Sequence, residues 1–193
     1  MASRGLRWKD LPESVRRTHS PVVIPRGEVD MLKTSGKRIT RRYGVARAAS
    51  MIRHAERHGE YRPGVLEICV EGGRLLTLNE LLGVNGAQLT PYKRACHDAV
   101  LECVWVALGR TPSEPLFDSV VLHLTRATRS HPGIDADALA ASFKYVIDGL
   151  RRARVFPDDD PGCVRAIVPR QTQARTNRFS VLVEAVQVEG DGE

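Results

Sequence analysis

The feature that most constrains the fold is an amphipathic pattern over residues 138–152, which predicts a helix between two strand-like segments. Its apolar positions recur at helical spacing and form one face that belongs in a core: Leu139, Phe143, Val146, Ile147 and Leu150. The segment Phe117–Thr125 before it is rich in valine, and Val164–Val168 after it is again β-like. Pro157 and Pro161 keep the intervening chain out of a helix.

The remaining pattern predicts an α+β fold, in which a mixed β-sheet packs against two main helices. Leu66, Ile68 and Val70 alternate with polar residues and predict a half-buried strand. After the Gly72-Gly73 turn signal, the pattern predicts another strand over 75–78, the other main helix from a Thr90 cap to Leu108, and a last strand over 179–188.

The charge is distributed unevenly along the chain. Residues 1–62 carry 15 basic and 6 acidic side chains, a net charge of +9, whereas the rest carries −3 and the whole chain +6. We therefore divide the chain into a basic extension, 1–64, and a compact domain, 65–193. The extension is expected to be partly disordered, with a short helix near 44–58. Such a basic arm suits a polyanionic partner, although basic extensions are also often solvated tails.

Several classes of protein are disfavoured. No run of about 18 apolar residues exists to cross a membrane, and the N-terminus lacks the apolar block of a signal peptide, so a cytoplasmic protein is expected. The four cysteines form no C-x-x-C pair, and Cys96 and Cys103 are expected to be buried in a helix. His54 and His58 have a metal-ligand spacing, but without a third ligand they are expected to be solvated.

The candidate site begins with Asp135 and Asp137 at the start of the 138–152 helix. Two carboxylates at i and i+2 in an extended segment point the same way and can converge on Mg²⁺. Lys144 follows Asp137 by seven residues, nearly two helical turns, and so lies on the same stripe. Asp148, four residues further on, can pair with Lys144 and orient it.

The segment after the helix is predicted to complete the site. The helix is about 22 Å long, and an extended chain from Arg152 to Asp159 spans about 23 Å, so Asp159 can return beside Asp135 and Asp137. Three carboxylates and a lysine suit phosphodiester hydrolysis. A D-x-D pair, however, also occurs in glycosyltransferases, phosphatases and plain helix caps, and Asp158–Asp160 can be a solvated turn.

Taken together, these motifs resemble the RusA family of Holliday junction resolvases, in particular its phage and prophage members, over about residues 65–188. The matching segments are Asp135-Ala-Asp137-Ala-Leu139, Lys144-x₃-Asp148-Gly149-Leu150 and Val155-Phe156-Pro157-Asp158-Asp159, with weaker matches at Gly73–Asn79 and Arg178–Val183. The resemblance implies a homodimer that cuts branched DNA in a bacterial or phage-infected cell, with Mg²⁺ or Mn²⁺ and no organic cofactor.

The resemblance also implies roles for residues. Asp135, Asp137 and Asp159 would bind the metal, Lys144 would be the catalytic lysine, and Asp148 and Asp158 would support them. The candidate DNA contacts are Asn79, Lys93, Arg94, Arg126 and Arg129.

The chain departs from the family pattern at two positions. Ala138 stands where the family usually has Asn, and Arg154 stands where a Gly is common. A catalytically weakened junction-binding protein and an unrelated Mg²⁺-dependent phosphatase therefore remain alternatives to an active resolvase.

Overall fold

The computed structural model describes residues 36–82, 84–129 and 133–186, and they form an α+β fold around one five-stranded sheet. The strands are β1 (Glu56–Arg62), β2 (Val65–Glu71), β3 (Val120–Thr128), β4 (Val164–Gln173) and β5 (Arg178–Ala185). Their order across the sheet is β1-β2-β5-β3-β4, in which only β3 and β4 are parallel neighbours. The predicted α+β class with a mixed sheet is confirmed.

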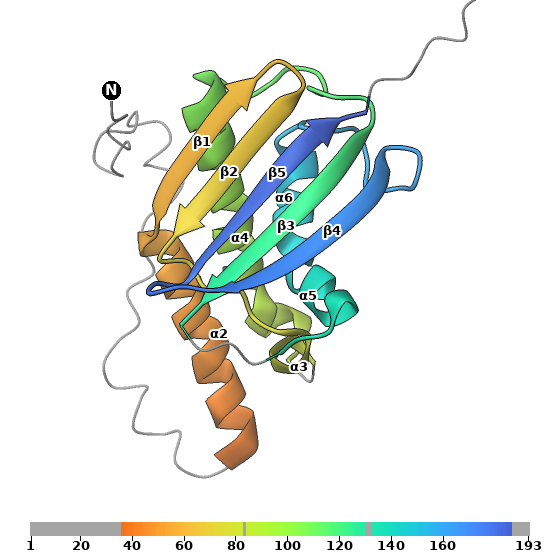
Figure 1. The fold of residues 1–193 in the computed structure, drawn as a ribbon. Helices are drawn as coiled ribbons and strands as arrows, with labels where there is room; N and C mark the ends of the chain where they lie inside the picture. Colours follow the sequence, from red (N-terminus) through yellow and green to blue (C-terminus); the bar gives the residue numbers. More distant parts are fainter. Residues whose placement is uncertain (1–35, 83, 130–132, 187–193) are drawn as a thin grey trace, which may run out of the picture.

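The helices gather behind one face of this sheet (Figure 1). They are α2 (Gly36–His54), α3 (Leu78–Leu81), α4 (Gly86–Leu108), α5 (Ala136–Ser142) and α6 (Lys144–Arg152). The long helix α4 packs against α2, α6 and the strands β1 and β2. Gly149 allows α6 to approach α4 closely, because a Cβ there would lie only 3.1 Å from Cβ of Val100.

Alternating apolar residues in the central strands form the floor of the core. Leu66, Ile68 and Val70 of β2 are fully buried, as the alternation predicted, and so are Val181 and Val183 of β5. These side chains face the helices, while the polar residues between them lie on the opposite face. Burying this apolar surface is the main favourable contribution to folding.

The predicted boundary at residue 64 does not separate two units among the described residues. Val45, Ala48 and Ile52 of α2 are buried in the same core as the sheet. The helix expected over 44–58 also ends early, at His54, and Glu56–Arg62 forms the edge strand β1. The predicted disorder falls largely on residues 1–35, which lie outside the described residues.

The strand β1 has no apolar alternation, and a glycine and an ion pair hold it against α4. A Cβ on Gly59 would lie 2.1 Å from the Cys103 carbonyl oxygen, so only glycine permits this approach. Nearby, Arg57 Nε lies 2.7 Å from the Glu102 carboxylate in an almost fully buried ion pair. Close backbone approach and buried charge explain why an apolar pattern could not reveal this strand.

The strand expected over 75–78 is wrong. Leu75 and Leu76 are buried in irregular chain, where side chains satisfy their backbone groups: Leu76 N–H donates to the Tyr92 hydroxyl (2.9 Å), and the Leu75 carbonyl accepts from Arg126 (3.3 Å). The following helix α4 also starts before the predicted Thr90 cap. Its N-cap is Asn85, whose side chain accepts from the Gln88 N–H at 2.9 Å.

The helix expected over 138–152 is interrupted at Phe143. Phe143 N–H donates to Ala140 and its carbonyl accepts from Val146, which are the i to i−3 bonds of a tighter turn. The buried Ser142 hydroxyl donates to the Leu139 carbonyl (2.6 Å), a side-chain bond that competes with regular helix. The chain therefore continues as two short helices, α5 and α6.

The strand β4 lies at one edge of the sheet, opposite β1. Ile167 and Val168 are 42% and 45% exposed there, between the exposed Arg165 and Arg170. Pro169, in the middle of the strand, removes one backbone donor. Among the described residues, no helix has the length and apolar character needed to cross a membrane.

Candidate functional site

The acidic pair lies where the sequence predicted it. Asp135 is the N-cap of α5, and Asp137 lies in the first turn. Both side chains are exposed, and the Asp135 carboxylate makes no capping hydrogen bond to the helix that it precedes. An N-cap carboxylate usually accepts from the N–H groups of the first turn. The carboxylate of Asp135 is therefore not engaged in a capping hydrogen bond.

Lys144 is the first residue of α6, and it pairs with Asp148. Its Nζ lies 3.8 Å from Asp148 Oδ1, and its side chain is 63% exposed. The predicted i, i+4 pair is confirmed. The prediction that Lys144 and Asp137 lie on one helical stripe assumed an uninterrupted helix. The tight turn at Phe143 interrupts the helix, so this assumption does not hold.

The acidic segment after α6 does not return toward Asp135. The chain folds tightly at the end of α6, since the Val155 N–H donates to the Leu150 carbonyl. The residues before β3 hold this turn in place: the Leu116 N–H donates to the Arg154 carbonyl, and the Phe117 N–H donates to the Val155 carbonyl. Val120 N–H, at the start of β3, then donates to the Cys163 carbonyl. Asp159 therefore precedes the start of β4, beside the start of β3, whereas the chain reaches Asp135 from the opposite end of β3 (Figure 1).

The predicted three-carboxylate site is thus not assembled within one chain. Among the described residues, Asp135, Asp137 and Asp159 are not a group whose ligand atoms all lie within 4.8 Å of one another. The prediction failed because it treated residues 152–159 as extended, whereas they form turns. A single chain in this arrangement does not fit a Mg²⁺ ion bound by all three carboxylates.

Asp158 and Asp160 stabilise the turn in which they lie. Asp158 Oδ1 accepts from Arg151 Nη1 (3.1 Å) and from the Asp159 N–H (2.9 Å). The Asp159 N–H bond, together with Arg151, keeps the pKa of Asp158 below its ordinary value. Asp160 Oδ1 accepts from the N–H groups of Gly162 (2.6 Å) and Cys163 (3.0 Å). Within one chain, the carboxylates of Asp158 and Asp160 therefore have a structural role.

Arg154 occupies the position where the family pattern has glycine, and its backbone is left-handed, with φ 56°. Its N–H donates to Arg151, and the neighbouring N–H of Val155 donates to Leu150, which together close the end of α6. Left-handed backbone favours glycine at helix ends. The departure noted in the sequence therefore falls on a strained residue.

The candidate DNA contacts lie in different environments. Asn79 is exposed in α3 and Arg94 is exposed on α4. Lys93 Nζ lies 5.0 Å from the centre of the Tyr145 ring, and the exposed Arg129 donates through Nε to the Arg175 carbonyl. Arg126 is different, because it is only 5% exposed. The prediction that Arg126 contacts DNA at the surface is wrong, since its side chain points toward the helices from the inner face of β3.

A cationic strip, which we define as Lys93, Lys144, Arg151 and Arg152, lies where α4 meets α6, and the Asp148 carboxylate lies beside it, paired with Lys144. Burial lowers the pKa of His97 on α4, Arg152 and Lys93 lower it further, and Asp148 raises it, so this imidazole adds no positive charge to the strip at neutral pH. Arg151 at the end of α6 reaches Asp158. The strip therefore extends from the start of α6, just after α5, to the turn that holds Asp158–Asp160.

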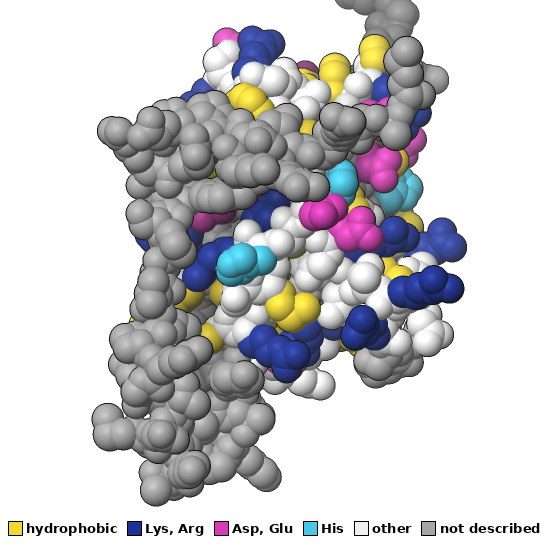
Figure 2. All heavy atoms as spheres, turned by 90° about the vertical axis from the view of Figure 1, so that its left-hand side faces the viewer, with side chains coloured by type: hydrophobic (Ala, Val, Ile, Leu, Met, Phe, Trp, Pro, Cys, Tyr) yellow, Lys and Arg dark blue, Asp and Glu magenta, His cyan; other side chains and the backbone are white. Residues whose placement is uncertain are grey.

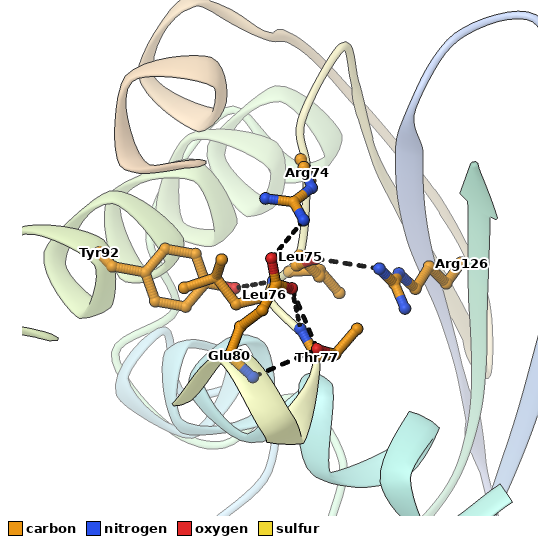
Figure 3. Close-up of polar contacts among 7 residues, drawn as sticks. All are labelled: Arg74, Leu75, Leu76, Thr77, Glu80, Tyr92 and Arg126. Atoms are coloured by element: carbon orange, nitrogen blue, oxygen red, sulfur yellow. Dashed lines mark hydrogen bonds and ion pairs between the residues drawn. The ribbon is translucent and has the colours of Figure 1, made fainter. Parts of the chain in front are cut away.

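Sequence reasoning missed a polar network between β2 and α4 (Figure 3). Arg74 Nη2 donates to Glu80 Oε1 at 2.5 Å, and Glu80 Oε2 accepts from the N–H (2.8 Å) and hydroxyl (3.1 Å) of Thr77. The Thr77 hydroxyl in turn accepts from Glu80 N–H, which completes a capping box at α3. The Thr77-x-x-Glu80 spacing was the available signal for this cap.

The group that could hold a metal by proximity lies elsewhere. Among the described residues, Glu56, His58 and Glu71 place their ligand atoms within 4.8 Å of one another, with His58 Nε2 3.9 Å from each carboxylate. The pairing of Glu56 with Glu71 across β1 and β2 creates this group. Figure 2 shows acidic and histidine side chains side by side on this aspect of the molecule. It was missed because β1 was not predicted.

Two cysteines have the packing role that was expected of them. Cys96 and Cys103 are fully buried in α4, and burial raises the pKa of each thiol to about 12. Such thiols stay protonated at neutral pH and are poor nucleophiles.

Comparison with known protein families and with curated proteins finds no match to the chain.

Proposed function

We propose that the chain is a structure-specific DNA endonuclease of the RusA type, which cuts four-way junctions and related branched DNA in recombination and repair. It would act as a homodimer and require a divalent cation, Mg²⁺ or Mn²⁺. The observation that carries the proposal is the cationic strip on α4 and α6, which extends from the end of the molecule that holds Asp135 and Asp137 toward Asp159. Lysine and arginine side chains in such a strip neutralise successive phosphates of a DNA backbone.

A homodimer would account for the separation of the carboxylates. Asp137 and Asp159 lie toward opposite ends of the parallel β3 and β4 strands in one chain. A two-fold axis relates equivalent surfaces of two copies in opposite directions. It can therefore bring the strand end near Asp137 of one copy beside the strand end near Asp159 of the other. Each of two shared sites would then receive carboxylates from both copies, and a four-way junction presents two equivalent strands to cut.

The separation of the carboxylates also favours a second candidate, a catalytically weakened junction-binding protein. Ala138, which replaces the Asn of the family pattern directly after Asp137, points the same way. The two candidates share the DNA partner and the cationic strip. They differ in whether Asp137 and Asp159 ever act in one site.

Mixing two inactive variants would separate the candidates. Asp137→Asn and Asp159→Asn are prepared separately, then co-refolded or co-expressed, and nicking of a synthetic four-way junction is measured with and without Mg²⁺. If sites are shared between copies, each mixed dimer regains one intact site, and about a quarter of the wild-type sites are restored by random pairing. Activity of wild type without restoration in the mixture would reject shared sites, and inactive wild type that still binds would support the second candidate.

The strip itself is tested by the salt dependence of junction binding. Arg152→Ala should reduce the slope of log affinity against log salt by about one, because one phosphate contact is lost. Arg62→Ala is the matched control, since Arg62 is an exposed arginine on β1, at the opposite edge of the sheet. Equal slopes for Arg152→Ala and wild type would remove the strip as the DNA-binding surface.

A further inference from the structure

Arg126 is a buried guanidinium with unused hydrogen-bond donors. Its side chain comes from the inner face of β3 and is 5% exposed, and its Nη2 donates to the Leu75 carbonyl at 3.3 Å. Its Nε and Nη1 are shielded from solvent and have no hydrogen-bond partner among the described residues. Buried donors without partners are costly, and guanidinium groups in proteins stay charged. The arrangement therefore favours an additional acceptor beside Arg126.

The charges around Arg126 are unbalanced toward positive. The ionisable side chains whose charges act on it are Arg74, Glu80 and Tyr92. Burial raises the pKa of Tyr92 well above its ordinary value, so this hydroxyl is neutral. Two arginines then face one carboxylate, which Arg74 already engages at 2.5 Å. The cluster has a net charge of +1 and can accept one more anion.

We propose that Arg74 and Arg126 form a binding site for a phosphate monoester, either inorganic phosphate or the terminal phosphate of a nucleotide. Figure 3 shows Arg126 reaching from β3 to the Leu75 carbonyl, and the guanidinium of Arg74, the residue before Leu75, bonded to Glu80. A tetrahedral phosphate can accept from two guanidinium groups that approach from different directions, and arginine suits such contacts. In the absence of ligand, the Glu80 carboxylate holds the place of the phosphate at Arg74.

The exposure of these groups decides the size of the ligand. The side chains of Arg74 and Glu80 are 30% and 34% exposed, so a small anion can approach from their side once Glu80 moves. Arg126 lies behind them in the interior. A phosphodiester within a DNA strand carries a sugar on both sides and cannot reach that depth. The site is therefore distinct from the proposed DNA-binding strip, and its existence does not depend on endonuclease activity.

Calorimetric titration of the full chain in chloride buffer tests the site. The probes are inorganic phosphate, deoxyadenosine 5′-monophosphate and deoxyadenosine. Wild type should bind the two phosphates and not the nucleoside, and the tighter of the two phosphates identifies the source. Arg126→Met should weaken phosphate binding at least about tenfold, since charge-assisted hydrogen bonds are lost. Arg110→Met, which removes an exposed arginine just after α4, should bind like wild type.

Two further variants keep the test decisive if Arg126→Met folds poorly. Arg74→Met changes a partly exposed side chain and should also weaken phosphate binding. Glu80→Gln should strengthen it several-fold, because glutamine preserves the capping box while the competing negative charge is removed. An interior arginine with a purely structural role predicts no gain from Glu80→Gln. Absence of phosphate binding by wild type at millimolar concentration, or binding unchanged in both arginine variants, would overturn the proposal.

Discussion

The two acidic segments of the chain look alike in sequence and differ in what their carboxylates do. Asp135 and Asp137 are exposed at the start of α5, where Asp135 makes no capping bond. In the second segment, Asp158 and Asp160 accept hydrogen bonds from their own turn. Carboxylates available for chemistry are therefore distinguished from structural ones by their hydrogen-bond partners, which spacing alone does not reveal.

The largest expected difference between the segments is catalytic. Asp137→Asn should reduce Mg²⁺-dependent junction nicking at least about 100-fold, because an amide does not supply the negative charge of the carboxylate. Asp160→Asn keeps an acceptor oxygen for Gly162 and Cys163 and should nick like wild type. Cleavage rates of a labelled four-way junction measure both. Equal losses in the two variants would mean that the segments do not divide these roles.

Stability should show the reverse order. Asp160→Ala removes the acceptor of two backbone N–H groups and should lower the free energy of unfolding by about 1–2 kcal/mol. Asp135→Ala should change it by less than about 0.5 kcal/mol, since its carboxylate makes no capping bond. Urea unfolding followed by circular dichroism compares the two. A larger loss for Asp135→Ala would contradict the assignment of structural and available carboxylates.

A substitution in the turn between α6 and the second acidic segment should stabilise the protein. Arg154→Gly should raise the free energy of unfolding by about 1 kcal/mol, because glycine adopts the left-handed conformation without the strain of a side chain. Arg152→Gly, two residues earlier and within α6, should lower it by a similar amount. Thermal unfolding of both variants gives the signs. Destabilisation by Arg154→Gly would show that contacts of the arginine outweigh its backbone strain.

The smallest expected effect is a pH dependence confined to the second segment. The pKa of Asp158 lies below its ordinary value of 3.8, first because of the hydrogen bond from Asp159 N–H and then because of Arg151. A lowered folded-state pKa stabilises the protein above the unfolded pKa, and this contribution is lost as pH falls through the folded-state value. Carbon NMR titration of the Asp158 carboxylate measures it. Arg151→Ala should raise this pKa, and an unchanged value would mean that the ion pair does not form in solution.

Several parts of this fold could be predicted because local patterns determine them. The alternation at Leu66, Ile68 and Val70 matched a buried strand face, and the Asp135-Ala136-Asp137 segment was correctly placed at a helix start. The α+β class followed from the mixture of such segments. Each of these inferences needed only residues within one or two turns of one another.

The errors arose where distant residues or side-chain hydrogen bonds determine the backbone. The helix after Asp137 is interrupted where the Ser142 hydroxyl donates to the Leu139 carbonyl. Side chains rather than a strand hold the next example, since the Leu75 carbonyl accepts from Arg126 and the Leu76 N–H donates to the Tyr92 hydroxyl. The site prediction failed for the same reason. It relied on how far an extended chain can reach, while hydrogen bonds keep residues 153–163 at the end of α6.

The edge strand β4 affects how strongly newly synthesised chains tend to aggregate. A ten-residue strand with exposed Ile167 and Val168 is a template on which other nascent chains could add strands and begin to aggregate. Pro169 interrupts that template, and the flanking charges of Arg165 and Arg170 repel a like copy. These residues would act as gatekeepers that keep newly made molecules dispersed until the sheet is complete.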